Sequence, residues 1–400
     1  MTKRDLLVGL GVGLSFGYVA VRAFEASHEL RAPAPVKPKD AASYGRQRRL
    51  YAVAGMLRGF PISASFAFGG GAGFIAKLTR PPKHTWLHPA VFVATTMAVT
   101  TAVELPVDFF EDYALERRYG LTHQPLHGWL IDRAKETALG TFFAALIVTG
   151  FAALARRLPR LWPFVASLCG FGLFALVNLV VPVYVMPLFN RFEPLRGPLE
   201  RRLRELAKPF GVEDARIMRM DMSRRTTKAN AFVTGIGNTH RIVIGDTLLE
   251  HFPDDEIAFV VAHELGHYVS KDSWRIIGLG GTLTTVILFG SELLLPPGRR
   301  ARVHEPETLI QFYFWMTLVS AALRPALLAF MRSREWSADR FALEATHAPA
   351  IGAQAFRRLR DQNLSEDEQP PWFDFLFASH PSLKKRIAAL ESAARLRHDR

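Results

Sequence analysis

The segment His263-Glu264-Leu265-Gly266-His267 combines two imidazoles and a carboxylate at a spacing that suits metal chemistry. Residues four apart stand on one face of a helix, so both imidazoles can bind one Zn²⁺. Glu264, beside the first histidine, is then placed to take a proton from a water at the open coordination position. The pattern therefore predicts metal-assisted hydrolysis of a peptide bond.

The alternative for this segment is a helix with two ordinary surface histidines. Its three fixed positions arise by chance on the order of once per hundred chains of this length. However, an apolar run at 257–262 leads directly into His263, so the helix is expected to be buried. Buried imidazoles and carboxylates need polar partners, because unpaired ones are costly away from water. A metal ion supplies such a partner, which favours the functional interpretation.

The composition indicates a membrane protein. Of the 400 residues, 49% are hydrophobic, and the mean hydropathy of +0.09 is high for a soluble protein of this size. The formal net charge of +13 is explained by basic loops beside anionic lipid headgroups, since no nucleic-acid motif accompanies it. Cys169 is the only cysteine, so metal ligands must be histidines and carboxylates.

Seven apolar segments are long enough to cross a bilayer, which needs about 20 residues. The first follows a short basic N-terminus, as in a signal peptide, but without a small-residue cleavage site, so an uncleaved anchor is expected. The chain is thus expected to be a mainly α, multi-pass membrane protein. The segments are 6–23, 50–78, 89–107, 137–155, 163–186, 276–295 and 309–331.

The polar stretches set the expected domains. Residues 1–188 form a membrane region with five spans and a polar loop at 108–136. Residues 189–274 form a zinc protease domain, 275–331 a two-span hairpin, and 332–400 the helical C-terminal part of the protease domain. With seven spans, the polar domains share one face, which carries most of the Lys and Arg. The positive-inside rule then places the zinc site on the cytoplasmic side.

A hydrolytic zinc site needs a third protein ligand. The helix that bears His267 is expected to enter the sixth span, and the seventh returns the chain to the same face, where Glu335 follows. Glu335 is therefore the expected third ligand. Asp339, one turn later, can accept the second N–H of a ligating histidine. By itself this segment also fits a charged surface helix, but its place beside the membrane on the histidine face favours the ligand interpretation.

Residues 228–234 and 241–244 predict two β-strands around a glycine-rich turn. An exposed edge strand can bind an extended peptide by strand addition, and Asn230, Ala231 and Phe232 are the expected contacts. From the local sequence, an ordinary hairpin is an equal alternative.

Together these segments resemble the zinc-dependent CAAX prenyl protease (type I) family of integral-membrane metalloproteases. Tyr268 departs from the pattern, since the family often has Trp there. The segments that carry the resemblance are 262–267, 333–339, 221–226, 230–232, 242–248, 105–106, 116–121 and 186–192.

The resemblance implies a seven-helix transmembrane barrel that encloses a chamber, with a gluzincin-like zinc protease domain carrying a small β-hairpin or sheet. It implies one Zn²⁺ per chain, held by His263, His267 and Glu335. His380, whose local sequence alone favours the start of a helix, becomes a stabiliser of the transition state. Arg386 becomes an active-site partner.

The expected partners are the lipid bilayer and a protein or peptide substrate, either a prenylated CAAX protein or another membrane-associated chain, and no nucleic acid. The expected location is a bacterial inner membrane. Two alternatives stay open. A heat-shock-type membrane metalloprotease for protein quality control would have fewer spans. A non-catalytic membrane scaffold would hold its zinc with four protein ligands.

Overall fold

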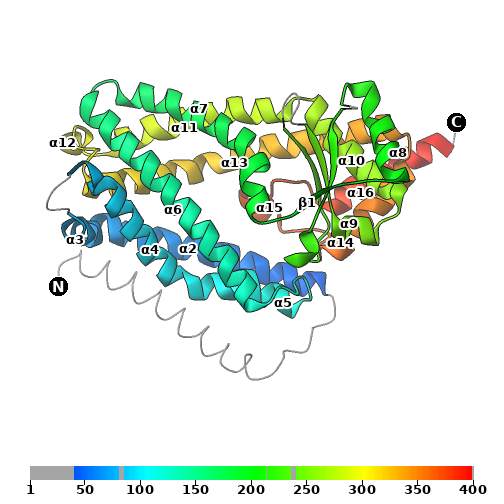
Figure 1. Ribbon diagram of the computed structural model, residues 1–400, viewed down its shortest axis with the longest axis horizontal. Helices are drawn as coiled ribbons and strands as arrows, with labels where there is room; N and C mark the ends of the chain where they lie inside the picture. Colours follow the sequence, from blue (N-terminus) through cyan, green and yellow to red (C-terminus); the bar gives the residue numbers. More distant parts are fainter. Residues whose placement is uncertain (1–39, 81–84, 213, 236–239, 399–400) are drawn as a thin grey trace.

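The computed structural model describes residues 40–80, 85–212, 214–235 and 240–398. Long helices lie together in one half of the molecule, and a four-stranded sheet with shorter helices forms the other half (Figure 1). Helix α13 extends from one half into the other, so that a membrane helix also carries residues of the sheet half.

The first half contains the longest helices of the described chain. With their short flanking turns they are α2 (Ala41–Phe68), α3 (Gly71–Leu78), η1 (Thr85–Leu87), α4 (His88–Asp108), η2 (Phe109–Ala114), α5 (Leu115–Arg118), α6 (Leu126–Arg157), α7 (Trp162–Val180), η3 (Val181–Val185), η4 (Met186–Leu188), α11 (Asp272–Leu294), α12 (Pro297–Arg300) and α13 (Pro306–Thr346).

The second half combines the strands with short helices. Its elements are β1 (Phe192–Pro194), α8 (Pro198–Ala207), η5 (Lys208–Phe210), β2 (Arg216–Met220), η6 (Met222–Arg224), β3 (Ala231–Thr234), β4 (Arg241–Gly245), α9 (Asp246–His251), α10 (Asp254–Val269), α14 (Pro349–Gln362), α15 (Pro371–Phe377) and α16 (Leu383–His398).

Four helical segments are long and apolar enough to cross a membrane, and two bent pairs of helices raise the number among the described residues to six if each pair is one span. The pair of α2 and α3 bends by 59° next to Gly70, whose φ of 97° is accessible to glycine. The six expected segments from 50–78 to 309–331 all fall on these helices. The expected first span, 6–23, lies outside the described residues.

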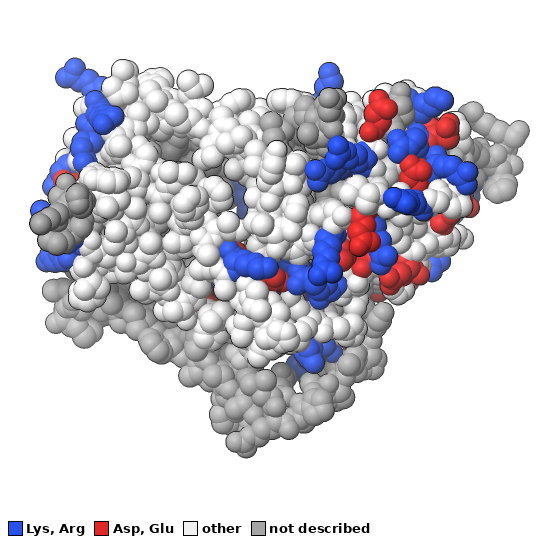
Figure 2. All heavy atoms as spheres, viewed as in Figure 1, with Lys and Arg blue, Asp and Glu red and all other residues white. Residues whose placement is uncertain are grey.

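The surface of the helical half is largely uncharged. Figure 2 shows Lys, Arg, Asp and Glu gathered over the sheet half and at the far end of the helices, with a broad white band between them. Large apolar side chains are exposed on this half, among them Phe142, Leu146, Phe164 and Leu168. Such a surface suits contact with lipid.

The region expected to be a polar loop, 108–136, is instead mostly helical. Helix α4 continues through η2 and α5 to Arg118, and α6 begins at Leu126. The polar side chains beyond the apolar stretches pair with each other, as Arg133 does with Asp112 at 2.9 Å. Ion pairs of this kind connect the two helical segments beyond their apolar stretches.

The sheet has the strand order β1-β2-β4-β3, so that β3 lies at one edge. Strands β3 and β4 pair antiparallel, as the predicted hairpin requires, whereas β2 and β4 are parallel. Most of the predicted turn between β3 and β4 falls outside the described residues. Helix α10 packs against the sheet in a core that includes Ile242, Ile244, Ile257 and Leu265.

The expectation that the histidine helix enters the sixth span is wrong. Helix α10 ends at Val269, and α11 begins at Asp272 as a separate helix. Between them, Lys271 adopts a left-handed conformation with φ 55°, which breaks the helix. By contrast, α13 runs unbroken from the seventh span through Glu335 and Asp339, across the expected domain boundary at 331.

Candidate metal centre

Helix α10 presents both histidines on the face that packs against α13. The rings of His263 and His267 lie 4.9 Å apart between centroids and are nearly perpendicular, at 89°. A Cβ at Gly266 would come within 3.0 Å of the Cα of Ala338 on α13. The absence of a side chain at Gly266 therefore lets α10 and α13 approach closely, and this approach brings Glu335 to the histidines.

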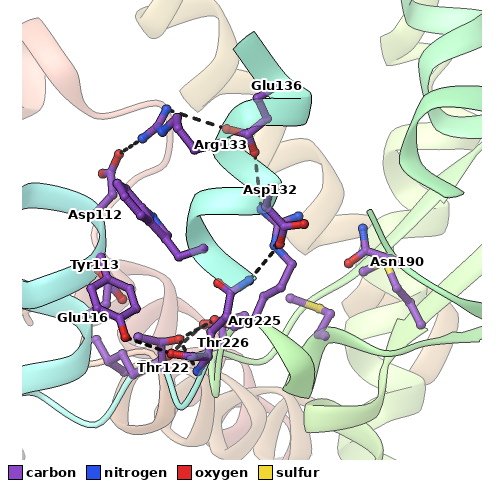
Figure 3. A pocket seen from close by; sticks show the side chains of 15 residues that line it. Asp112, Tyr113, Glu116, Thr122, Asp132, Arg133, Glu136, Asn190, Arg225 and Thr226 are labelled. Carbon is purple, nitrogen blue, oxygen red and sulfur yellow. Dashed lines mark hydrogen bonds and ion pairs between the residues drawn. The ribbon is translucent and has the colours of Figure 1, made fainter. Parts of the chain in front are cut away.

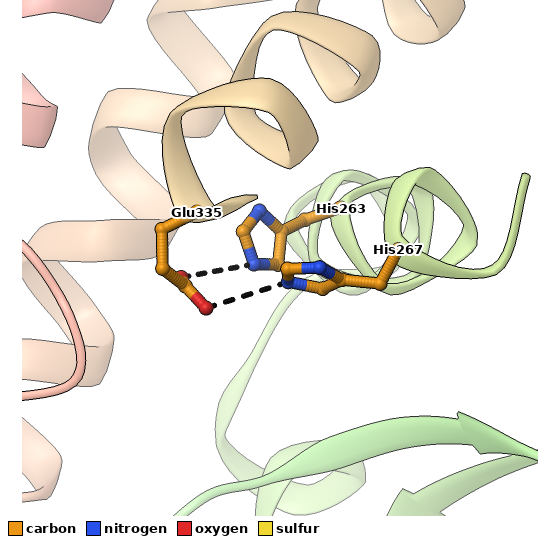
Figure 4. A group of neighbouring side chains, drawn as sticks. All are labelled: His263, His267 and Glu335. Atoms are coloured by element: carbon orange, nitrogen blue, oxygen red, sulfur yellow. Dashed lines mark ion pairs between the residues drawn. The ribbon is translucent and has the colours of Figure 1, made fainter. Parts of the chain in front are cut away.

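Glu335 lies opposite the two imidazoles (Figure 4). Nε2 of His263 is 3.5 Å from one of its carboxylate oxygens, and Nε2 of His267 is 3.4 Å from the other. One nitrogen or oxygen atom from each residue lies within 4.8 Å of the others. The structure thus brings together the three side chains that the sequence predicts as metal ligands.

This arrangement fits a metal ion. Two ligands of a tetrahedral ion with bonds of about 2.0–2.1 Å are separated by roughly 3.3 Å, close to the distances between the imidazole nitrogens and Glu335. Oε2 of Glu335 is buried and makes only long contacts within the described residues, 3.5 Å to Nε2 of His263 and 3.3 Å to the guanidinium of Arg386. A buried carboxylate oxygen whose nearest donors are this distant is incompletely satisfied, and a bound metal ion would satisfy it.

Each histidine is oriented by a second carboxylate at its other ring nitrogen. Nδ1 of His263 lies 2.9 Å from Asp339, and Nδ1 of His267 lies 2.9 Å from Asp272. Both carboxylates are buried. Because Nδ1 donates its hydrogen to a carboxylate, Nε2 of each neutral ring keeps its lone pair directed toward the centre.

Asp272 has no counterpart in the sequence prediction. It follows His267 by five residues, a spacing that would not share a face on a continuous helix, and it reaches the ring only because of the break at Lys271. Its other oxygen accepts a hydrogen bond from Nε of Arg334, at 2.7 Å. The structure identifies Asp272 by its buried carboxylate at the first residue of α11.

Arg386 of α16 connects the two carboxylates of α13. Its guanidinium makes two hydrogen bonds with Asp339, at 2.8 and 2.6 Å, and lies 3.3 Å from Oε2 of Glu335. It also lies over the ring of Phe356, 4.2 Å from the centroid. The buried arginine thus balances the negative charge on α13.

His380 lies on the open side of the centre. Its side chain is 60% exposed, and Nε2 is 3.2 Å from Oε1 of Glu335. Ser379 Oγ lies 2.8 Å from its Nδ1. His380 is therefore accessible to a substrate while it stays beside the candidate ligands.

The surroundings shift the pKa values of the centre. Burial lowers the pKa of His263, but hydrogen bonds to Asp339 and Glu335 outweigh it and raise this pKa to about 9. Burial raises the pKa of Glu264, against the opposing effect of the two histidines. A cation that binds here must therefore displace a proton at neutral pH.

The expected substrate contacts lie on the edge strand. Ala231 and Phe232 belong to β3, and Asn230, which precedes it, is exposed. Helix α10 packs beside β3, so that this edge of the sheet lies next to the helix that bears the histidines.

A second polar site lies where the membrane helices meet the sheet half (Figure 3). A cavity of about 450 Å³ is lined by η2, α5 and α6 on one side and mainly by the end of β2 and the segment after it on the other. Its charges are mutually paired, with Arg133 against Asp112 and Arg225 against both Asp132 and Glu136. None of the candidate metal ligands lines it, so this cavity is separate from the centre.

Membrane-crossing helices that carry a buried centre of two histidines and one glutamate define an integral-membrane metallopeptidase. Comparison with known families agrees. Residues 195–394 match the model of peptidase family M48, and residues 35–191 match that of the CAAX prenyl protease N-terminal region with five membrane helices. The chain belongs to peptidase family M48 and is a membrane metalloendopeptidase of the CAAX prenyl protease type.

Two related proteins and one solved structure are similar to this chain over most of its length. The uncharacterized metalloprotease YhfN of Bacillus subtilis is 31% identical over 76% of this chain and 74% of its own length. CAAX prenyl protease 1 of Saccharomyces cerevisiae is 27% identical over 75% and 71%, respectively. The crystal structure of S. mikatae Ste24p has the same fold, with a TM-score of 0.71 at 20% identity over 98% of this chain and 99% of that one.

These findings decide between the alternatives. The five-helix N-terminal match supports the CAAX prenyl protease type rather than the heat-shock type. Membership of a peptidase family supports an enzyme rather than a zinc scaffold.

Proposed function

We propose that the metal is zinc and that His263, His267 and Glu335 hold it. When bound, zinc lowers the pKa of a coordinated water toward ~7 and polarises the carbonyl of a scissile peptide bond. The observation that carries this proposal is that the Nε2 atoms of His263 and His267 both face Glu335. The Nδ1 atom of each ring is hydrogen-bonded to another carboxylate.

Glu264 is the proposed general base. It stands next to His263 on α10, and burial raises its pKa, which makes it a stronger base than an exposed glutamate. Glu264 removes a proton from the attacking water and afterwards delivers it to the leaving amine. Because the carboxylate returns to its starting state, one group serves both halves of the reaction.

His380, Asp339 and Arg386 support this chemistry in different ways. His380 is exposed beside Glu335 and donates a hydrogen bond to the oxyanion that develops on the substrate carbonyl. Asp339 fixes the tautomer of His263, and Arg386 holds Asp339 in place. Asn230, Ala231 and Phe232 bind the substrate backbone along the edge of the sheet.

The proposed substrates are CAAX-type proteins or other membrane-associated chains. The relatives named as CAAX prenyl proteases support the first class. The basic residues on the face of the sheet half support a cytoplasmic site, and a bacterial inner membrane is the proposed location.

The decisive experiment compares purified protein with its Glu264→Gln variant. The variant is expected to bind zinc as well as the wild type and to lose peptide hydrolysis by at least about a thousandfold. Retained hydrolysis would refute the assignment of Glu264. A farnesylated CAAX peptide and its unlipidated twin, cleaved side by side, test prenyl recognition, which equal cleavage would contradict.

A further inference from the structure

His380 lies in a short connection between two helices. Helix α15 ends at Phe377 and α16 begins at Leu383, so the backbone of His380 belongs to neither helix. Its imidazole is exposed and has Nε2 3.2 Å from Oε1 of Glu335. A residue outside regular structure keeps a fixed place only if its connection is attached to the elements beside it.

Arg332 attaches this connection to α13. Its Nη1 atom donates hydrogen bonds to the carbonyl of Asp374, at 3.0 Å, and to the carbonyl of Ala378, at 2.7 Å. Ala378 follows the last residue of α15, and the C=O groups at the end of a helix lack partners within it. A guanidinium supplies such a partner, and a charged donor makes a stronger hydrogen bond than a neutral one.

The helix that provides this attachment also carries a candidate metal ligand. Arg332 precedes Glu335 by three residues on α13, a spacing that makes the two side chains neighbours on the helix surface. Ala378 precedes His380 by two residues, and His380 in turn contacts Glu335. These four residues therefore form a closed ring, in which two pairs are joined along the chain and two pairs through side-chain contacts.

A second arginine of α13 supports the same end of α15. The guanidinium of Arg324 lies over the ring of Phe377, 5.2 Å from its centroid, and Phe377 stacks on Phe373. Helix α15 packs against α13 where α13 passes from the helical half into the sheet half (Figure 1). With α15 held there, the hydrogen bonds of Arg332 fix the direction in which the chain continues toward His380.

We propose that Arg332 is a positioning residue that holds His380 where the oxyanion of the substrate develops. This inference rests on the role proposed for His380. Ser379 bonds the ring of His380 but belongs to the same connection, so it cannot fix that connection to α13. The hydrogen bonds of Arg332 go to α15 and not to the candidate ligands, so its effect on the reaction passes through His380. A displacement of about 1 Å at a reacting group costs on the order of a hundredfold in rate.

The first test measures cleavage of a farnesylated CAAX peptide by the full-length protein with zinc. Arg332→Ala is expected to lower kcat roughly 10–100-fold with little change in KM or zinc content, because the ligands and the proposed substrate contacts stay in place. Arg332→Lys keeps a cationic donor and should recover at least about threefold of this loss. Arg340→Ala, an exposed arginine on the same helix, is the matched control and should be as active as the wild type.

The second test separates positioning from a general structural role. If Arg332 acts through His380, Arg332→Ala should cost less than about threefold in kcat when His380 is already alanine. A loss in that background as large as in the wild type would overturn the proposal and leave the metallopeptidase assignment intact. A loss of zinc in proportion to the loss of activity would overturn it as well. No cleavage by the wild-type protein would instead refute the proposed function and this inference with it.

Arg332→Gln serves if Arg332→Ala does not fold. It keeps much of the side chain but replaces the charged donor with a neutral one, so kcat should fall at least about threefold when His380 is present. In the His380→Ala background the same substitution should cost less than about twofold. Equal losses in the two backgrounds would refute the role of Arg332.

Discussion

His267 and Asp272 are joined by a hydrogen bond of 2.9 Å between Nδ1 and the carboxylate, across a break between two helices. The carboxylate belongs to the first residue of α11, and its second oxygen binds Arg334, the neighbour of Glu335. Asp272 thus connects both His267 and the part of α13 that bears Glu335 to the start of a membrane helix.

This relationship makes Asp272 important for metal affinity. Asp272→Asn is expected to weaken zinc binding roughly 10–100-fold, because the amide polarises the imidazole of His267 less than the carboxylate does. Competition with a chelator measures the loss. Asp254→Asn, an exposed acidic residue in the first turn of α10, is the control and should bind zinc normally. Wild-type affinity in Asp272→Asn would contradict the prediction.

Zinc affinity should depend steeply on pH. The pKa of His263 is raised to about 9, so below that pH zinc must displace a proton, and affinity should rise by nearly tenfold per pH unit above pH 7 and level off near pH 9. Asp339→Asn weakens the interaction that raises this pKa, and the rise should level off at a lower pH. Titrations at several pH values check both statements, and an affinity that is flat from pH 7 to 9 would disprove the first.

Gly266 should be sensitive to the smallest substitution. In Gly266→Ala the new Cβ would lie 3.0 Å from the Cα of Ala338, so α10 and α13 must separate and carry Glu335 away from the histidines. The expected cost is about 1–3 kcal/mol in stability, with weaker zinc binding. Thermal unfolding with and without zinc measures both. Gly278→Ala in α11, where a Cβ meets nothing within 4 Å, should be almost neutral.

His380 should affect the rate and not the metal. His380→Ala is expected to lower kcat roughly 100–1000-fold, because a donor to the developing oxyanion is lost. Zinc content and KM should change little, since His380 is exposed beside the three candidate ligands and is not one of them. Metal analysis and steady-state kinetics separate the two cases. A loss of zinc equal to the loss of activity would assign His380 to metal binding instead.

Much of the centre follows from local sequence. The spacing of His263 and His267 places both rings on one helix face whatever surrounds that helix. The apolar segments indicate the membrane hairpin that returns the chain to Glu335, and the structure brings these three side chains together. Asp339 and Arg386 also lie at the centre, as expected. The roles assigned to these residues stay predictions, to be decided by the experiments above.

Other relationships could not be predicted from the sequence. Periodicity says which residues share a face, but not which distant groups meet. It did not reveal the parallel pairing of β2 with β4, because β3 lies between these two strands in the sequence. Nor did it reveal that Asn363 pairs with Ala229, 134 positions away.

The sequence by itself thus determined the type of chemistry and the membrane setting, since helical spacing and apolar length are local properties. The tertiary structure decided how the centre is supported and bounded. Lys271 breaks a helix that periodicity would continue, and this turn alone carries Asp272 to His267. Contacts of that kind depend on the packing of separate elements, which no single segment encodes.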